Sequence, residues 1–285
     1  MTELFQRLLN QPAVSYVDVE SRRTTVGVYF SERPNSIQLR KQLTRGLAEV
    51  KRCGLKIAPV RISVKKLRRE DWVESWKRHF QPIKIGSALL IKPGWSRCRP
   101  AKGQALVVLN PGLSFGTGQH PTTGFCLKQL VLCRDWSRAK SFLDIGTGSG
   151  ILAIAAAKLG YSPVEAFDSD PDSVRIANTN ARQNRVAGVL RIRNADITRL
   201  TRRGGGKFDV ICANLTADLL LSQCDRITNQ LKAGGILVLA GILKAEFPAV
   251  QRVYRNKGLK PVFNEIKKEW RSGAFRAPNG SKRFH

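Results

Sequence analysis

The sequence predicts an α/β protein built on a doubly wound, mostly parallel sheet of seven strands. Between residues 141 and 266, short apolar segments of strand length alternate with longer segments of helical character. A glycine-rich loop separates the first strand from the first helix, which predicts a β-loop-α-β unit with a right-handed crossover. The last two strand segments, 259–266 and 273–275, predict a closing hairpin. These observations indicate a Rossmann-like fold.

The first 65 residues predict a small α+β domain. Residues 14–19 and 24–30 are β-branched runs joined by a polar tetrapeptide, which predicts a hairpin. Residues 37–50 carry apolar side chains at helical spacing, and residues 56–64 alternate as a third strand. The segment contains no catalytic constellation, so we interpret it as a substrate-recognition domain.

A linker helix is predicted next. Residues 65–80 are charged and carry Trp72, Trp76 and Phe80 at intervals of four, a stripe that typically packs, and Pro82 ends the segment. We therefore expect a linker helix over residues 66–84 and a catalytic domain over residues 85–285.

A glycine- and threonine-rich loop follows two further predicted strands, 85–92 and 105–109. It spans residues 110–126 and includes Phe115 and His120. Ordering such a loop costs conformational entropy, so we expect that the loop has a function. His120 is either a base or, as for most single histidines, structural. Either Thr122 or Thr123 is expected to cap the following apolar helix, a role compatible with contact to a ligand's carboxylate.

The remaining elements alternate as the fold requires. The final sheet strand before the hairpin is preceded by a predicted turn at residues 232–235. Strands are predicted at 142–145, 164–167, 189–192, 208–213 and 236–239, and helices at 151–159, 172–184, 219–231 and 247–256.

The glycine loop and an acid indicate an adenosine-type ligand. Gly146, Gly148 and Gly150 let the backbone turn sharply and approach a ligand closely, with amides of the helix start facing it. Asp168 follows Gly146 by 22 residues, at the tip of the second strand. A carboxylate at that position accepts hydrogen bonds from a ribose diol.

The kind of adenosine ligand follows from the loop's spacing and charge. The pattern is Gly-x-Gly-x-Gly, whereas dinucleotide folds use Gly-x-Gly-x-x-Gly. Asp144, two residues before the first glycine, adds an acid inside the loop that would repel a pyrophosphate and suits cationic groups. S-adenosylmethionine carries a sulfonium and an ammonium, so we expect it rather than NAD. The closing hairpin is likewise typical of methyltransferase folds rather than dehydrogenases.

Two further polar residues follow predicted strands. Asn214 ends the strand at 208–213, where open α/β sheets bind ligands. Asp196 follows the strand at 189–192 and is either a contact for an adenine amino group or an ordinary turn acid.

The chain is strongly basic. It has 49 Lys and Arg against 21 Asp and Glu, a formal net charge of +28. The excess is spread, with 18 basic and 8 acidic residues in 1–84 and 31 and 13 in 85–285. This charge indicates either attraction to polyanions such as RNA or a ribosome, or a generally basic surface.

The composition also excludes several classes of protein. The six cysteines form no C-x-x-C pair, so we expect reduced thiols, no metal site and a cytoplasmic location. No apolar run is long enough to span a membrane, and the N-terminus does not resemble a signal peptide. We expect a monomer.

Several stretches resemble the PrmA family, the methyltransferases of large-subunit ribosomal protein L11. The segment EDWVESWKRHFQPIKIG is similar to the family's Trp-rich linker, and NPGLSFGTGQHPTTGFCL to its specific loop. The motifs LDIGTGSGILAIAAAKLG and FDSDP resemble its more widely shared cofactor motif. Later strands match in ANLTADLLL and LKAGGILVLAGIL. The resemblance covers roughly residues 70–245 and is weak over residues 1–65.

The resemblance implies the cofactor, the substrate and the site. It implies N-methylation of lysine or N-terminal amines of ribosomal protein L11 with S-adenosylmethionine. A separate hypothesis on the mechanism places Asn214 and Phe115 at the mouth of a desolvated channel, where Asn214 positions the substrate amine. The chain departs from the family's Asn-Ile-Leu-Ala with Leu215 and Thr216. The residues expected to bind the cofactor, from the motif and the resemblance together, are Thr123, Asp144, Gly146, Gly148, Asp168 and Asn214.

Three alternative functions remain open on the sequence alone. One is methylation of another lysine-bearing protein. A second is an RNA methyltransferase, which the net charge favours, although such enzymes commonly show Asn/Asp-Pro-Pro-aromatic where this chain has Asn214-Leu215-Thr216-Ala217. The third is a non-catalytic ribosome-binding protein, against which the intact glycine loop and Asp168 argue.

Overall fold

The computed structural model divides into two compact units, Met1–Trp76 and Lys77–His285. The structure describes residues 9, 13–17, 24–28, 30, 34–52, 60, 62–63, 81–109, 120–135, 137–199 and 208–279. No helix within these residues is both long and apolar enough to cross a membrane.

The first unit contains the predicted hairpin and helix. β1 (Ala13–Val17) pairs antiparallel with β2 (Thr24–Val28), with Ala13 opposite Val28. α2 (Ser36–Arg52) begins after Asn35, whose Oδ1 accepts hydrogen bonds from the Ile37 and Gln38 amides at 3.1 and 3.2 Å. The predicted third strand (56–64) and the linker helix lie almost entirely outside the described residues.

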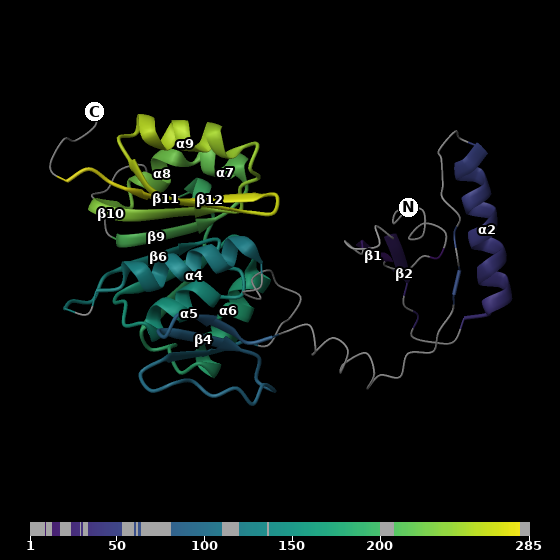
Figure 1. Cartoon of the computed structure of the whole chain (residues 1–285), viewed down its shortest axis with the longest axis horizontal. Coiled ribbons are helices and arrows are strands. Elements are labelled where there is room, and N and C mark those ends of the chain that lie inside the picture. The colour runs from purple at the N-terminus through teal and green to yellow at the C-terminus, as the bar shows by residue number, and fades with distance from the viewer. Residues whose placement is uncertain are drawn as a thin grey trace. The chain divides into compact units, whose positions relative to one another are not determined.

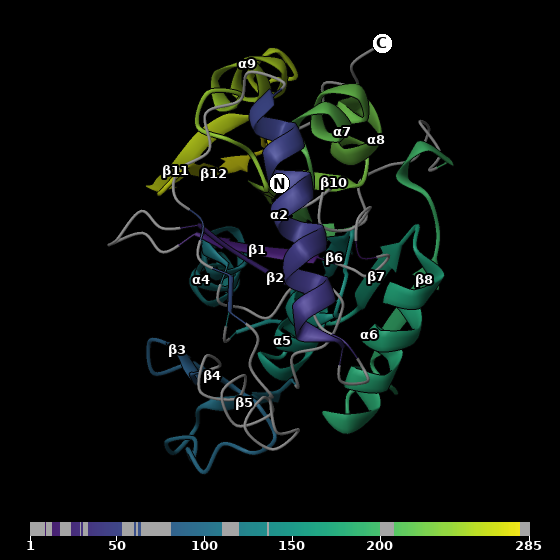
Figure 2. The ribbon, with the colours of Figure 1, turned by 90° about the vertical axis from the view of Figure 1, so that its right-hand side faces the viewer.

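A seven-stranded sheet forms the centre of the second unit, as the sequence predicts. Its strand order is β11-β12-β10-β9-β6-β7-β8 (Figures 1 and 2). The pairs among β10, β9, β6, β7 and β8 are parallel, whereas β12 is antiparallel to both β10 and β11. The strands span β6 (Phe142–Ile145), β7 (Val164–Asp168), β8 (Leu190–Asn194), β9 (Phe208–Asn214), β10 (Leu231–Ala240), β11 (Lys260–Lys267) and β12 (Trp270–Arg276).

Helices cover both faces of this sheet because its strands are apolar on both sides. In β6, Phe142 belongs to one hydrophobic core, whereas Leu143 and Ile145 belong to the other. Figure 1 shows the two helix layers on opposite sides of the sheet. One layer contains α4 (Pro121–Cys133), α5 (Ile151–Lys158) and α6 (Pro171–Gln183); the other contains α7 (Ala217–Ser222), α8 (Cys224–Thr228) and α9 (Phe247–Asn256).

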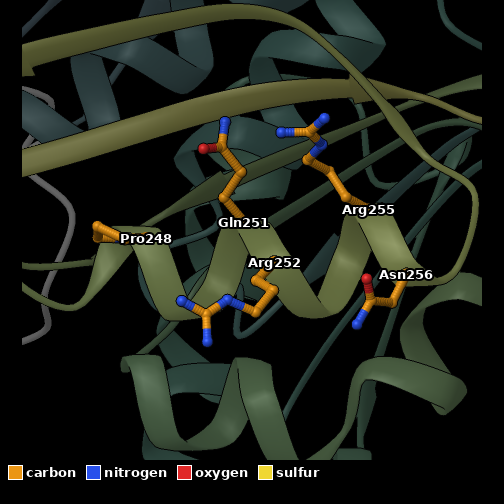
Figure 3. A pocket seen from close by; sticks show the side chains of 5 residues that line it. All are labelled: Pro248, Gln251, Arg252, Arg255 and Asn256. Atoms are coloured by element: carbon orange, nitrogen blue, oxygen red, sulfur yellow. The ribbon is translucent and has the colours of Figure 1, made fainter.

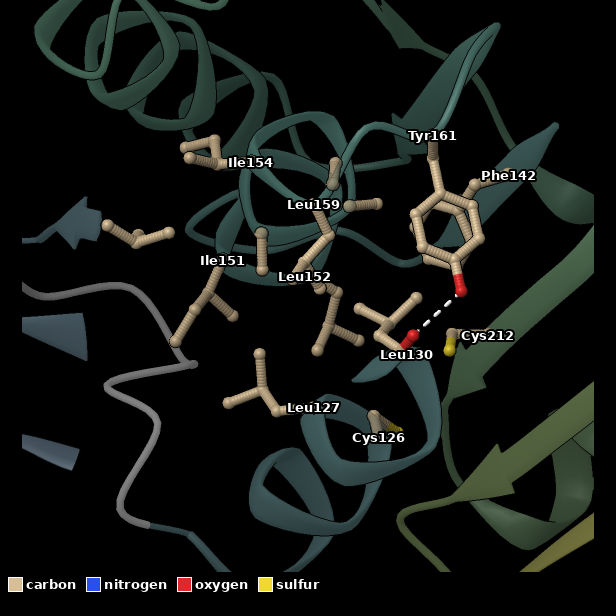
Figure 4. Close-up of a cluster of buried hydrophobic side chains, with 14 of the residues drawn as sticks. Cys126, Leu127, Leu130, Phe142, Ile151, Leu152, Ile154, Leu159, Tyr161 and Cys212 are labelled. Carbon is tan, nitrogen blue, oxygen red and sulfur yellow. Dashed lines mark hydrogen bonds between the residues drawn. The ribbon is translucent and has the colours of Figure 1, made fainter. Parts of the chain in front are cut away.

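A second, three-stranded sheet packs against α5. β4 (Leu89–Lys92) pairs with β3 (Ile83–Ile85) antiparallel and with β5 (Ala105–Val108) in parallel. The single strand predicted at 85–92 is therefore wrong: a turn at Gly86 separates β3 from β4. In the shared core, Phe142 packs edge-on against Tyr161, whose hydroxyl donates to the Leu130 carbonyl at 2.7 Å (Figure 4).

Two other predictions are wrong. The helix predicted at 219–231 is two short helices, α7 and α8, separated at Gln223, because α7 packs on α9 whereas α8 packs on β10. The predicted turn at 232–235 is a bulged part of β10, whose register against β9 shifts between Leu231 and Ile236. Glycine in a strand marks such a bulge as readily as a turn.

Candidate functional site

The glycine loop lies at the carboxyl end of β6 and leads into α5. Gly146, Gly148 and Gly150 have φ values of +72°, +52° and +82°, a region that side-chain-bearing residues rarely adopt. A Cβ at Gly146 would lie 2.5 Å from Leu215 Cδ2, so a side chain at this position would displace Leu215 and would be strained by the positive φ. The loop from β6 and the segment after β9 are therefore in direct contact.

Asp168, at the end of β7, is joined to this loop by a hydrogen bond. Its Oδ2 accepts from the Gly148 amide at 2.8 Å, and its Oδ1 accepts from the Asp170 amide at 3.0 Å. A carboxylate has about four acceptor positions, so capacity remains for hydroxyl donors. The structure thus brings the predicted ribose acceptor and the predicted glycine loop together.

Asp144 differs from the expectation in its location. It lies within β6 rather than in the loop, and only 1% of its surface is exposed. Its Oδ2 accepts from Thr147 Oγ1 at 2.7 Å and from the Ala153 amide at 3.2 Å, so this carboxylate fixes both the loop and the start of α5. Its Oδ1 has no partner among the described residues.

The burial of Asp144 also changes its titration. Loss of hydration raises the pKa of this carboxyl to about 7, and the nearby charge of Asp168 acts in the same direction. The hydrogen bonds from Thr147 and Ala153 oppose the rise. A buried acid with an unsatisfied oxygen is costly to the fold, which makes it a candidate contact for a polar or cationic ligand.

Asn214 is the last residue of β9 and is partly exposed. The backbone of Gly241, just after β10, approaches it so closely that a Cβ at Gly241 would lie 3.1 Å from Asn214 Oδ1 and 2.5 Å from the Leu215 carbonyl oxygen. From the sequence, Leu215 was noted only as a departure from the family's motif, and Gly241 was not singled out. The glycine that directly follows the apolar strand at 236–240 was the available signal.

Thr123 lies in the first turn of α4, 1% exposed, and its hydroxyl has no partner among the described residues. The expectation that Thr122 or Thr123 caps this helix is wrong. His120 occupies the N-cap position, and Pro121 follows as the first helical residue. Thr123 is thus not joined to the glycine loop by a hydrogen bond of its own, although α4 packs on α5 and β9.

His120 has structural contacts. Its Nδ1 lies 2.7 Å from Thr122 Oγ1, and its ring packs edge-on against Trp270 with centroids 5.0 Å apart. Burial lowers the pKa of this imidazole, and opposing charges at Glu269 and Lys268 contribute less. The imidazole thus links the start of α4 to the terminal hairpin.

Of the two remaining predicted residues, Asp196 lies beside Asp168 at the carboxyl edge of the sheet, because the Ala195 amide donates to the Asp168 carbonyl oxygen at 2.9 Å. Phe115 lies outside the described residues. Asp196 follows β8 and accepts a hydrogen bond from the Thr198 amide at 2.8 Å as the 3-10 turn Ile197–Arg199 begins, and the pKa of Asp196 is lowered by this interaction. No group of three or more metal-binding side chains occurs in the described part of the chain.

The residues at this edge fit S-adenosylmethionine. The loop presents backbone at Gly146, an acid at the end of β7 can accept from a diol, and two buried polar atoms, Asp144 Oδ1 and Thr123 Oγ1, have no partner within the described part of the chain. The chemistry matches a ligand with hydroxyl and cationic groups. Fold and site together define an S-adenosylmethionine-dependent methyltransferase.

The comparison with known proteins gives the family. A family model described as ribosomal protein L11 methyltransferase (PrmA) matches residues 4–277. The chain belongs to this family. The resemblance inferred from the motifs is thereby confirmed, and the match extends over the N-terminal segment, where sequence similarity is weak.

Relatives and a solved structure agree with this assignment. A ribosomal protein L11 methyltransferase of Citrifermentans bemidjiense is 40% identical over 229 residues, 79% of this chain and 72% of the relative. One from Syntrophotalea carbinolica is 36% identical over 269 residues, 93% and 86% of the two chains. The crystal structure of a ribosomal protein L11 methylase from Lactobacillus delbrueckii subsp. bulgaricus superimposes with a TM-score of 0.61 at 29% identity, covering 70% of this chain and all of that one.

Proposed function

We propose that this protein transfers methyl groups from S-adenosylmethionine to lysine side chains or the N-terminal amine of ribosomal protein L11. The observation that carries this proposal is the family match over residues 4–277, which spans both the carboxyl edge of the sheet and the N-terminal unit. The geometry of the glycine loop, Asp168 and Asp144 supports the choice of cofactor.

The site residues have separable roles in this proposal. The bound cofactor supplies an electrophilic methyl group on a good leaving group. Asp168 holds the ribose, and Gly146 and Gly148 provide a backbone surface without side chains. Asp144 keeps the loop in place through Thr147 and Ala153 and offers Oδ1 to a cationic group. Thr123 contributes its buried hydroxyl.

An amine must be neutral before it attacks. For lysine this costs about 4–5 kcal/mol at neutral pH, given a reference pKa near 10.4. Desolvation lowers the cost, so Asn214 and Phe115 are proposed to line a dry channel mouth that orients the nitrogen in line with the methyl group. Asn214 is proposed to position the amine and to contact the cofactor: replacing it with alanine should reduce kcat and raise the cofactor Kd. Unchanged turnover would remove it from the site.

We also propose a division of labour along the chain. Residues 1–65 recognise the substrate, residues 66–84 form a linker helix and residues 85–285 carry the chemistry. Deleting residues 1–65 should preserve cofactor binding and abolish methylation of the intact substrate. Methylation that survives the deletion would contradict this division.

The substrate assignment is tested by a mass measurement. The protein is incubated with labelled S-adenosylmethionine and purified ribosomal proteins or ribosomal RNA, and the products are analysed by intact mass. Gains in steps of one methyl group, confined to ribosomal protein L11, are expected. Label on a different protein would retain the chemistry and overturn the substrate, whereas label in RNA would favour the alternative function as an RNA methyltransferase.

The proposal also covers the protein's location, its oligomeric state and its contact with the ribosome. The protein acts in the cytoplasm, as a monomer, and contacts a ribosome or its RNA through its basic surface. Light scattering coupled to gel filtration should return the mass of one 285-residue chain. A mass of two chains would overturn the monomer assignment.

A further inference from the structure

A hollow on the outer side of α9 lies apart from the residues assigned to the cofactor. It is lined by Pro248, Gln251, Arg252, Arg255 and Asn256, all from this one helix. Figure 3 shows the polar side chains extending from successive turns of α9 to both sides of its exposed surface. This spacing, with residues three and four apart, places them on one helix face.

The segment around this hollow carries more positive than negative charge. Residues 246–265 include four cations, Arg252, Arg255, Lys257 and Lys260, and two acids, Glu246 and Glu265, at the ends of the segment. Lys257 pairs with Asp225 of α8, whereas Arg252 and Arg255 form no ion pair within the described residues. Elsewhere in this unit arginines do have acidic partners: Arg175 pairs with Asp172, and Arg193 with Glu165. The two guanidinium groups of the hollow are therefore uncompensated.

The donors of the hollow determine what it binds. Among the described residues, two guanidinium groups and two carboxamides line it, and neither an aromatic ring nor a carboxylate does. Guanidinium groups donate paired hydrogen bonds to phosphate oxygens, and carboxamide NH₂ groups add further donors. With Pro248 as the one apolar lining residue, the hollow offers little to stack a base. Its chemistry matches anionic oxygens rather than nucleobases.

We propose that this face of α9 binds the phosphate backbone of RNA without selecting a sequence. The net charge of +28 favours a polyanion over a single phosphorylated side chain, because each neutralised phosphate of a polyanion releases counterions. Arg252 and Arg255 lie about 4.5 Å apart along the helix axis. Because Figure 3 shows them extending to opposite sides of α9, they are expected to contact two neighbouring phosphates rather than a single one. The surface provides an RNA contact that is separate from methyl transfer.

The test compares two pairs of arginines in the full-length protein. The hollow variant is Arg252→Gln/Arg255→Gln, and the control is Arg97→Gln/Arg99→Gln, two exposed residues of the β4–β5 loop. Both variants lose the same charge. Fluorescence anisotropy with a labelled single-stranded RNA of about 20 nucleotides, a length that exceeds typical single-strand site sizes, gives the Kd over a range of salt concentrations. S-adenosylmethionine affinity and melting temperature are measured in parallel and should match wild type in both variants.

The expected result is specific to the hollow. Its variant should lose about tenfold in RNA affinity at low salt, and the slope of log K against log salt should fall by about 1.4 if each arginine neutralises one phosphate of a single strand. The control should keep its affinity and slope. Equal losses in both variants would overturn the proposal, because any two arginines would then suffice. Tighter binding of a phosphoserine peptide than of RNA to the same arginines would also overturn it.

Discussion

The two edges of the central sheet hold carboxylates in opposite states. At the amino edge, Asp209 Oδ2 accepts hydrogen bonds from the Ser141 amide at 2.9 Å, the Ser141 hydroxyl at 2.7 Å and Lys232 Nζ at 2.8 Å. At the carboxyl edge, Asp144 is more deeply buried, yet its Oδ1 has no partner within the described residues. Asp209 Oδ2 thus receives three hydrogen bonds from within the protein, whereas Asp144 retains one carboxylate oxygen without a donor among the described residues.

The pKa shifts of the two acids differ in the same way. Burial alone would raise the pKa of Asp209, but the hydrogen bonds from Lys232 and Ser141 outweigh it and lower the value to about 2. Burial dominates at Asp144 and raises its pKa to about 7. At the amino edge the polar groups of the fold satisfy one another, whereas at the carboxyl edge buried polar atoms lack partners among the described residues, which is the pattern expected of a ligand site.

The largest expected effect is at Asp168. Replacing it with alanine removes two charge-assisted acceptors for the ribose, so cofactor affinity should fall about 100-fold, equivalent to roughly 3 kcal/mol. Isothermal titration with S-adenosylmethionine measures the Kd. The matched control, Asp209→Ala, should bind within about twofold of wild type, since it removes an acid from the opposite edge. Equal affinity for S-adenosylmethionine in the Asp168 variant and wild type would show that the carboxyl edge contributes no more to cofactor binding than the amino edge.

The same Asp209→Ala variant should instead lose stability. It leaves Lys232 and Ser141 without their acceptor, at an expected cost of about 2–3 kcal/mol in the free energy of unfolding at neutral pH. Because the folded pKa is lowered, this contribution is present above about pH 4 and disappears as the pH falls towards 2. Urea unfolding at both pH values measures it. A penalty that persists undiminished in acid would show that the charge is irrelevant.

Asp144 should show the opposite pH dependence. Its folded pKa lies above its unfolded value, so the folded protein binds the proton more tightly and its stability falls as the pH rises from about 4 to about 7. An asparagine side chain is not ionisable yet can still accept from Thr147 and Ala153, so Asp144→Asn should remove this part of the slope. Unfolding across the pH range compares the two proteins. Identical slopes of stability against pH would mean that the pKa of the Asp144 carboxyl is the same in the folded and unfolded protein.

The smallest effect is expected at Thr123. Thr123→Val replaces an unsatisfied buried hydroxyl with a methyl group, which should leave stability unchanged or raise it by up to about 1 kcal/mol while cofactor affinity falls a few-fold. Thr122→Val is the control, because the Thr122 hydroxyl is engaged by His120 and its loss should lower stability instead. Melting temperatures and titrations separate the two. Destabilisation by Thr123→Val would indicate a structural hydroxyl.

Much of the fold was predictable because its periodicity is local. Apolar runs such as 142–145 and 208–213, bounded by turns and polar residues, predict the strands of β6 and β9. The break between α7 and α8 at Gln223 was not predictable, since neither proline nor glycine marks it and packing on two different partners imposes it. The bulge in β10 escaped prediction because its glycines are equally typical of a turn.

The sequence predicted which residues of the candidate site lie together better than it predicted what each residue does there. The spacing of Gly146, Gly148 and Asp168 predicts that loop and acid meet, and the 2.8 Å hydrogen bond between Gly148 and Asp168 is that contact. The anchoring role of Asp144 depends on the Ala153 amide, which only the packed α5 brings to it. The N-cap role of His120 depends on where α4 begins, and proline at 121 was the available signal.

A crystal structure with S-adenosylhomocysteine bound tests most directly whether the unpartnered polar atoms at the carboxyl edge serve the cofactor. We predict that Asp168 accepts from the ribose hydroxyls and that Asp144 Oδ1 and Thr123 Oγ1 gain hydrogen-bond partners from the ligand or from water it orders. The contacts of Asp209 with Ser141 and Lys232 should stay unchanged. A ligand bound elsewhere, or one that leaves both Asp144 Oδ1 and Thr123 Oγ1 unsatisfied, would contradict the assignment of this edge as the cofactor site.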